Sequence, residues 1–228
     1  MTQVTVTAGP PAQLTLAPAT QTQTVDTQAC LTATVTDAFG NPTPKIVVQF
    51  SVTGVNMASG SGTTNSNGQT TFCYVGRLFG ADTVEATASA TATGVATVTW
   101  VLPVTTPLCA VDITNGGWII ANDGDKASFG GNASSDQAGN PSGQEQYTDS
   151  PANLDVHSIN VLAIVCSNNM EKAEIFGQAT IDGSGQHAYR IDVSDPDSAG
   201  GSDTYGILLD TGYDSGVHPL GGGNIEFH

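Results

Sequence analysis

Apolar residues recur at every second position along much of this 228-residue chain, and this alternation constrains its fold more than any other feature. Leu31, Ala33 and Val35 alternate with threonines, and Val48 and Phe50 continue the pattern after a turn. Period two with one apolar face is typical of a half-buried β-strand. Leu, Lys, Glu and Arg are scarce while Thr, Val and Gly are common, which excludes a helical bundle. We therefore expect an all-β protein.

Acidic residues are concentrated in the second half of the chain. The formal net charge is −16, of which residues 1–107 contribute −2 and residues 108–228 contribute −14. Between the halves, two prolines and several β-branched residues predict a stiff linker. This step in composition predicts an extended arrangement of four segments: an N-terminal strand and linker over 1–10, a first β-domain over 11–100, a linker over 101–108, and an acidic all-β domain over 109–228.

The same charge excludes two classes of partner. Five basic residues are too few to displace counterions from a nucleic acid, and they give no attraction to an anionic membrane. The longest apolar stretch, near Val161–Cys166, is too short to cross a bilayer, and the N-terminus does not have the pattern of a signal peptide. These signals alone leave a mature secreted form and a cytoplasmic protein open.

The four cysteines favour the secreted form. Cys30, Cys73, Cys109 and Cys166 lie 36 or more positions apart, which does not fit a zinc site. Two fall in each domain, so we expect the disulfides Cys30–Cys73 and Cys109–Cys166, each worth about 4 kcal/mol. Four free thiols are the alternative. By strand phase Cys30 and Cys73 point away from the core, so a bridge through the core would need a β-bulge or a position at the sandwich edge.

The first domain resembles a known family. The stretches LTATVTDAFGNPTPKIVVQFSVTG, TTNSNGQTTFCYVG and DTVEATAS contain Thr36-Asp37, Gly40-Asn41-Pro42 and Asn67-Gly68-Gln69. Over residues 11–100 this is similar to the bacterial immunoglobulin-like domain of the invasin and intimin type. The resemblance implies an extracellular β-sandwich that serves as a spacer or adhesive repeat in surface proteins, without catalytic residues.

The second domain carries eight candidate strands, which fits an antiparallel sandwich or a barrel. They cover residues 111–120, 127–133, 144–148, 154–165, 173–181, 187–193, 204–209 and 224–227. The stretches NGGWII, ASFGGNAS, FGQATIDGSGQHAYRIDVSD and GGGNIEFH resemble a poorly characterised domain that follows immunoglobulin-like repeats in bacterial secreted proteins. This resemblance, over residues 109–228, implies location and fold class but no activity.

Loop carboxylates are the candidate metal ligands of this domain. Asp123 and Asp125 form one cluster, and Asp195, Asp197 and Asp203 form another, and calcium takes six to eight such oxygens. The alternative is two solvated acidic loops. We expect no other cofactor.

Asn132 begins an Asn-Ala-Ser glycosylation sequon. No GxSxG elbow is present, the four histidines share no metal-ligand spacing, and carboxylates are too numerous for any chosen pair to be informative. We therefore expect no enzymatic activity.

The first seven residues form a strand pattern that ends at a Gly-Pro-Pro break. Val4, Thr5, Val6 and Thr7 carry the alternation, and an unpaired strand of this kind promotes aggregation unless a sheet takes it up. Three possibilities are open: a remnant of a longer chain, pairing with the first domain, or strand donation to another copy, for which we favour the acidic domain as acceptor.

Head-to-tail donation would build a fibre. We therefore expect a non-catalytic extracellular subunit of a bacterial surface fibre or stalk that associates with itself. The alternative is an adhesin-type module whose acidic domain binds a glycan or receptor, with or without calcium.

Overall fold

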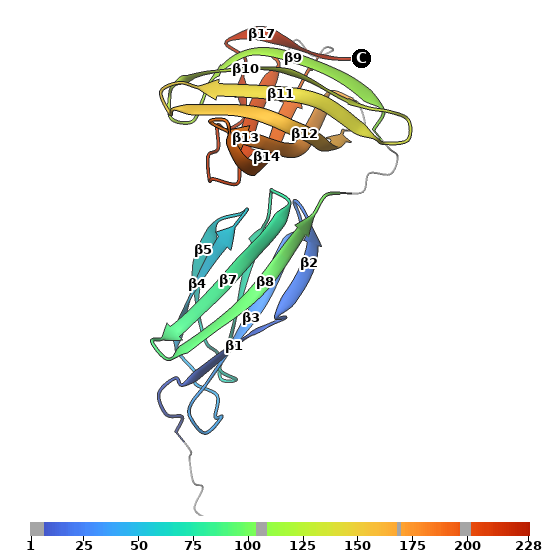
Figure 1. Cartoon of the computed structure of the whole chain (residues 1–228). Coiled ribbons are helices and arrows are strands. Elements are labelled where there is room, and N and C mark those ends of the chain that lie inside the picture. Colours follow the sequence, from blue (N-terminus) through green and yellow to red (C-terminus); the bar gives the residue numbers. More distant parts are fainter. Residues whose placement is uncertain (1–6, 104–108, 168–169, 197–201) are drawn as a thin grey trace, which may run out of the picture. The chain divides into compact units, whose positions relative to one another are not determined.

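The computed structural model describes residues 7–103, 109–167, 170–196 and 202–228. These residues form strands, turns and loops, and the expected all-β fold class is confirmed. Within the described ranges there is no helix of the length and apolar character needed to cross a membrane. The chain divides into two compact units, Met1–Val101 and Leu102–His228, which we describe separately (Figure 1).

The first unit is a sandwich of two sheets built from eight strands (Figure 1). The strands are β1 (Gln13–Ala17), β2 (Thr20–Thr24), β3 (Gln28–Thr36), β4 (Val47–Gly54), β5 (Ala58–Thr63), β6 (Gln69–Val75), β7 (Gly80–Ser89) and β8 (Ala92–Val101). One sheet has the order β1-β3-β6 and the other the order β2-β8-β7-β4-β5. The chain changes sheets between β1 and β2, at the cis peptide bond Ala17–Pro18.

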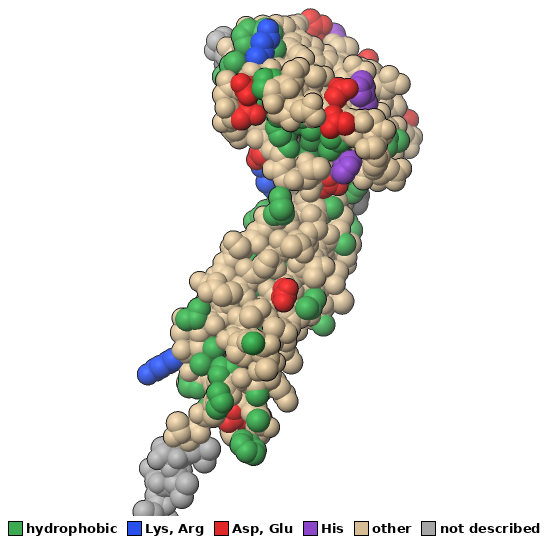
Figure 2. Space-filling view, turned by 60° about the vertical axis from the view of Figure 1, so that its left-hand side comes forward, with side chains coloured by type: hydrophobic (Ala, Val, Ile, Leu, Met, Phe, Trp, Pro, Cys, Tyr) green, Lys and Arg blue, Asp and Glu red, His purple; other side chains and the backbone are tan. Residues whose placement is uncertain are grey.

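The core of this sandwich contains the apolar residues that the alternation places inward. Leu31, Val35 and Val84 are completely buried, and Trp100 is nearly so. Their strand neighbours on the opposite faces are mostly Thr, Ser and Gln, and the face seen in Figure 2 carries few charged side chains on this unit.

Two strands of the first unit lack the apolar alternation. β2 reads TQTQT and β5 reads ASGSGT, and they are the two edges of the five-stranded sheet. An edge strand can be polar because much of it faces solvent, so a search for apolar period two finds no signal there.

Cys30 and Cys73 form a disulfide on the outer face of the three-stranded sheet. The two residues are direct partners in the regular antiparallel ladder between β3 and β6, with Cα atoms 4.1 Å apart. Both side chains are exposed, as their strand phase indicates. The pairing is the expected one, and it involves the edge strand β6 without a bulge. The bridge joins neighbouring strands of one sheet instead of crossing the core.

The second unit is a single nine-stranded antiparallel sheet. Its strands are β9 (Val111–Ile120), β10 (Lys126–Ser135), β11 (Pro141–Asp149), β12 (Leu154–Cys166), β13 (Lys172–Ile181), β14 (Ser184–Ser194), β15 (Thr204–Leu209), β16 (His218–Pro219) and β17 (Gly222–Phe227). From β9 to β15 each strand pairs with the next one along the chain. The segment 218–227 completes the sheet at both ends, because β16 pairs with β15 while β17 pairs with β9.

Two consecutive residues of this segment contact opposite ends of the sheet. The Leu220 N–H donates to the Asp203 carbonyl next to β15, and the Gly221 N–H donates to the Trp118 carbonyl in β9, both at 2.9 Å. The sheet therefore curls around one core, as Figure 1 shows. Of the two architectures expected for this domain, the sandwich and the barrel, the structure has the barrel-like one.

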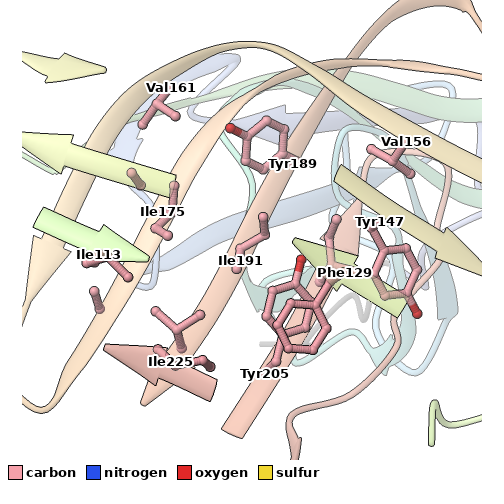
Figure 3. Close-up of a cluster of buried hydrophobic side chains, with 14 of the residues drawn as sticks. Ile113, Phe129, Tyr147, Val156, Val161, Ile175, Tyr189, Ile191, Tyr205 and Ile225 are labelled. Carbon is pink, nitrogen blue, oxygen red and sulfur yellow. The ribbon is translucent and has the colours of Figure 1, made fainter. Parts of the chain in front are cut away.

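One cluster of buried side chains fills the interior of the curled sheet (Figure 3). Phe129 and Tyr205 stack with ring centroids 3.7 Å apart, and Tyr147 is parallel to Tyr205 at 6.2 Å. Cys109 and Cys166 form the second disulfide, and both belong to or pack against this cluster. The bridge therefore joins the start of the unit to the end of β12.

Candidate functional site

Asp123, Asp125 and Asp149 form the one candidate cation group found among the described residues. One carboxylate oxygen of each lies within 4.8 Å of the others. Asp123 and Asp125 belong to a tight turn after β9, in which the Asp125 N–H donates to Oδ1 of Asp123 at 3.0 Å. Asp149 ends β11 and is completely buried. Three such carboxylates can hold a hard cation such as calcium, with water completing the coordination.

A chain of hydroxyl groups leads from the core to Asp149. Tyr213 donates to Oδ2 of Asp149 at 2.6 Å, and the hydroxyl groups of Tyr147 and Tyr213 lie 2.6 Å apart. Burial raises the pKa of Tyr147 to about 12, and burial and the bond to Asp149 raise the pKa of Tyr213 further. Both phenols therefore stay protonated, and the Tyr213 hydroxyl fixes the orientation of the Asp149 carboxylate.

The second predicted calcium cluster has other contacts. Oδ2 of Asp203 accepts a hydrogen bond from the Ile225 N–H at 2.9 Å, which ties the start of β15 to β17. Asp195 is buried, and its N–H donates to the Glu171 carbonyl at 2.9 Å. Asp197 lies outside the described residues. Asp203 thus has a structural role in closing the sheet.

The remaining predicted residues are either exposed or outside the described residues. Val4, Thr5 and Val6 of the predicted donor strand fall outside the described residues, and Thr7 is exposed and not in a strand. Asn132 is exposed on the outer face of β10.

Glu145 and Asn115 form a buried polar pair inside the second unit. Nδ2 of Asn115 donates to both carboxylate oxygens of Glu145, at 3.0 and 3.1 Å. Glu145 is 3% exposed, and burial raises its pKa from 4.5 to about 7, although the hydrogen bond from Asn115 works in the opposite direction. A carboxyl group that titrates near neutrality is often functional. The Glu145 side chain, however, points into the interior of the curled sheet and is buried there.

A glycine makes room for this pair. Gly131 lies between Asn115 and Glu145 in the ladder, and a Cβ at Gly131 would lie 2.5 Å from Oε2 of Glu145. Nearby in the core, Oδ1 of Asn115 and the Tyr205 hydroxyl are buried and have no hydrogen-bond partner within the described structure. The buried polar groups of Asn115, Glu145 and Tyr205 are therefore only partly hydrogen-bonded, which lowers the stability of the second unit.

Asp82 forms a second buried network, in the first unit. Its carboxylate accepts hydrogen bonds from the Trp100 indole at 2.7 Å, from the Tyr74 hydroxyl at 3.1 Å and from the Asn56 N–H at 2.8 Å. Burial, and then the charge of Asp82, raise the pKa of Tyr74. Oδ1 of Asn56 in turn accepts from the Leu78 N–H at 2.8 Å. The network joins β6, β7 and β8 to the loop before β5.

The sequence contains a signal for these buried polar groups that a search for apolar residues alone does not use. Asp82 shares the inward phase of Val84, and Glu145 shares that of Tyr147. A polar residue at an inward position needs partners, so the alternation itself marks both networks.

The described structure shows no assembly of catalytic groups. Each histidine contacts a different partner: His157 contacts Asp155, His187 contacts Asp210, His218 contacts Asn122, and His228 contacts Glu226. No described histidine belongs to a group of three potential metal ligands.

A comparison with protein families supports the fold of the first unit. The family model of the bacterial Ig-like domain (group 1) matches residues 11–101. The expected bacterial immunoglobulin-like domain is therefore confirmed for that segment. No curated protein matches the chain.

Two solved structures of a surface-layer protein were found among the matches. Domains 5–6 of the S-layer protein SbsC overlap 92% of this chain and 96% of that one, with a TM-score of 0.31 and 13% identity. Domains 1–6 of the same protein overlap 98% of this chain, with a TM-score of 0.33 and 15% identity. This chain spans about a quarter of the second structure, in which the overlap covers 26%.

Replacing Asp82 with alanine leaves three buried donors without an acceptor. We expect Asp82→Ala to lower the free energy of unfolding of the first unit by about 3–5 kcal/mol. Chemical denaturation followed by Trp100 fluorescence, in a Trp118→Phe background, measures this change. Glu85→Ala, an exposed carboxylate on the same strand, is the matched control and should change it by about 0.5 kcal/mol or less. Equal effects of the two substitutions would contradict the role of Asp82.

The raised pKa of Glu145 predicts how the stability of the second unit depends on pH. Since the folded pKa of about 7 exceeds the unfolded value of 4.5, the folded state binds the proton more tightly. Stability should therefore fall by about 3 kcal/mol as pH rises from 4.5 to 7 and level off above it. Glu145→Gln should remove this contribution and be more stable than the native chain at pH 8, whereas the exposed Glu226→Gln should not. Parallel pH profiles for all three proteins would show that Glu145 does not titrate in this range.

Proposed function

We propose that this chain is a non-catalytic structural subunit of a bacterial cell surface, assembled outside the cell. The observation that carries the proposal is the construction of the first unit. It is a sandwich with polar outer faces and an exposed disulfide between two strands of one sheet, in the segment that matches the bacterial Ig-like domain. Threonine-rich outer faces keep such a unit soluble and offer little apolar surface to which a ligand could bind. The two disulfides suit an oxidising exterior.

We propose further that subunits join head to tail by donating the strand Val4–Thr7. The described chain that follows it is tied to the first unit, because the Gly9 N–H donates to Oδ2 of Asp37 at 3.0 Å. An acceptor needs a free sheet edge. In the second unit the end strands of the sheet are the two-residue β16 and β17, and the Ile225 N–H of β17 is already bonded to Asp203. The first unit has four edge strands, and β6 is the longest of them, so we propose β6 of another copy as the acceptor.

The test compares two double variants that differ only in the face of the strand they alter. Val4→Ser with Val6→Ser removes the apolar face, and Thr5→Ser with Thr7→Ser is the matched control. We expect filaments in electron micrographs of the intact chain and the control, and monomers for the valine variant and for a deletion of residues 1–9. A native chain that stays monomeric in sedimentation at all concentrations, or equal filaments from the valine variant, would overturn strand donation.

A calcium-dependent binding module is the second candidate function, and the Asp123–Asp125–Asp149 group is the observation that favours it. Calcium should raise the Tm of the second unit in the intact chain, because it binds the folded state and relieves repulsion among the carboxylates. Asp123→Asn with Asp125→Asn should abolish the shift, and Asp112→Asn, an exposed carboxylate on β9, should preserve it. If calcium leaves the Tm of the native chain unchanged, the calcium site is excluded. If the chain binds a glycan array equally well with a chelator present, glycan binding does not depend on calcium.

A further inference from the structure

The Cys30–Cys73 disulfide is open to solvent on the outer face of the three-stranded sheet. Both cysteines are exposed, and they are direct partners in the ladder between β3 and β6. β6 is an edge strand, so among the described strands none pairs with it on the side away from β3. Exposed disulfides are the ones that exchange with thiols most readily, which makes this bridge a candidate site of chemical modification.

The strands that carry the bridge are held together without it. The register between β3 and β6 is continuous over the whole of β6. Next to the cysteines, Ala29, Leu31 and Tyr74 point inward and are buried in the core of the sandwich. Opening the S–S bond therefore leaves the two strands paired and the core closed, so a reaction at the bridge does not require the unit to unfold.

The two sulfurs differ in how a thiolate can approach them. A thiolate attacks one sulfur from the side opposite the other sulfur, because the bond that breaks lies along that line. The bridge runs across the strands, so the approach to Cys73 passes over the free edge of the sheet. On the Cys30 side, Nε2 of Gln21 donates to the Cys30 carbonyl at 3.3 Å, and Oε1 of Gln28 lies 3.7 Å from Sγ of Cys30. Cys73 is therefore the more accessible sulfur.

The surface around the bridge does not repel an anion. Every outward-facing residue of β1, β3 and β6 is Thr, Gln, Ala, Val or Cys. The sequence just before β3 and just after β6 adds one acid, Asp26, and one base, Arg77. A thiolate, which is the reactive form of a thiol, thus meets no excess of negative charge near Cys73.

The second disulfide does not share these properties. Cys109 is buried, and Cys166 packs against the core cluster of the second unit. Residues 108–228 carry a net charge of −14, which lowers the local concentration of an anionic thiolate. We therefore expect exchange in the first unit alone.

We propose that Cys73 is a covalent attachment site for low-molecular-weight thiols, which the Cys30–Cys73 bridge captures by thiol–disulfide exchange in the folded protein. The thiolate sulfur forms a bond to Sγ of Cys73 while the bond between Cys73 and Cys30 breaks. The electron pair of that bond leaves with Cys30, whose thiolate then takes a proton from water. One disulfide replaces another, so the step needs no oxidant. This inference goes beyond the proposed structural role and does not depend on assembly.

The experiment treats the intact chain with glutathione under native conditions, at a concentration where the chain sediments as a monomer and no added strand covers β6. An alkylating reagent, added early, marks the released thiol, and peptide masses locate both groups. We expect glutathione on Cys73 and the alkyl group on Cys30, with Cys109 and Cys166 unmodified. The absence of an adduct, glutathione on Cys30 in equal or larger amount, or opening of both disulfides at equal rates would overturn the proposal.

Two substitutions on the outer face of β6 test the direction of attack. Thr71→Glu places a carboxylate two residues from Cys73, about 7 Å along the strand, and should slow the reaction with anionic glutathione about threefold. Gln69→Glu, on the same face but about 13 Å away, is the matched control and should leave the rate unchanged. Equal rates for the native chain and both variants would contradict attack at Cys73.

A measurement on the native chain alone tests whether the reaction starts from the folded state. Because the bridge is already exposed, the rate constant should not change with urea at concentrations below the unfolding transition. A rate that rises steeply with urea would mean that thiols react only after the unit opens, and it would overturn the proposal. This measurement decides the matter if Thr71→Glu fails to fold.

Discussion

Both units depend on one constraint: along most strands every second side chain is buried and the others face solvent, while β13, β14 and β15 also bury consecutive residues. In the first unit the constraint is met by two sheets that face each other, and in the second by one sheet curled around its own core. In both units the interior is mostly apolar. Of the buried charged residues, Asp82 and Glu145 share the inward phase of their apolar neighbours and are held by hydrogen bonds from neighbouring strands.

The apolar alternation was sufficient to predict most strands, because burial is what it encodes. Strands β9 and β15 have the predicted bounds, and the others of the second unit differ by a few residues, apart from the two-residue β16. β8 was not predicted either, and β2 and β5 were missed because edge strands of Thr, Gln, Ser and Gly need no apolar face. Their existence follows from pairing with β8 and β4, which local sequence does not specify.

The cysteines show how a correct local inference can lead to a wrong geometric one. The outward phase of Cys30 and Cys73 was read correctly, but it was taken to conflict with their pairing unless a bulge or the sandwich edge intervened, and a bridge across one sheet was not considered. In a cross-strand bridge the outward phase is the required one, since the two side chains must share a face. The candidate cation group of Asp123, Asp125 and Asp149 was also predicted only in part. Asp123 and Asp125 are two positions apart in the sequence, but Asp149 joins them only through the strand order of the curled sheet.

The segment 218–227 has a consequence for how the second unit folds. β9 is the first strand of the unit, and its outer partner β17 is separated from it by more than 100 positions, with Phe227 opposite Ile113. Loop closure over such a distance is slow, and the intervening strands can pair as a meander before it happens. Until residues 218–227 are available, β9 and β15 remain open edges able to pair with other chains. The second unit is therefore most vulnerable to aggregation before residues 218–227 have paired with β9 and β15.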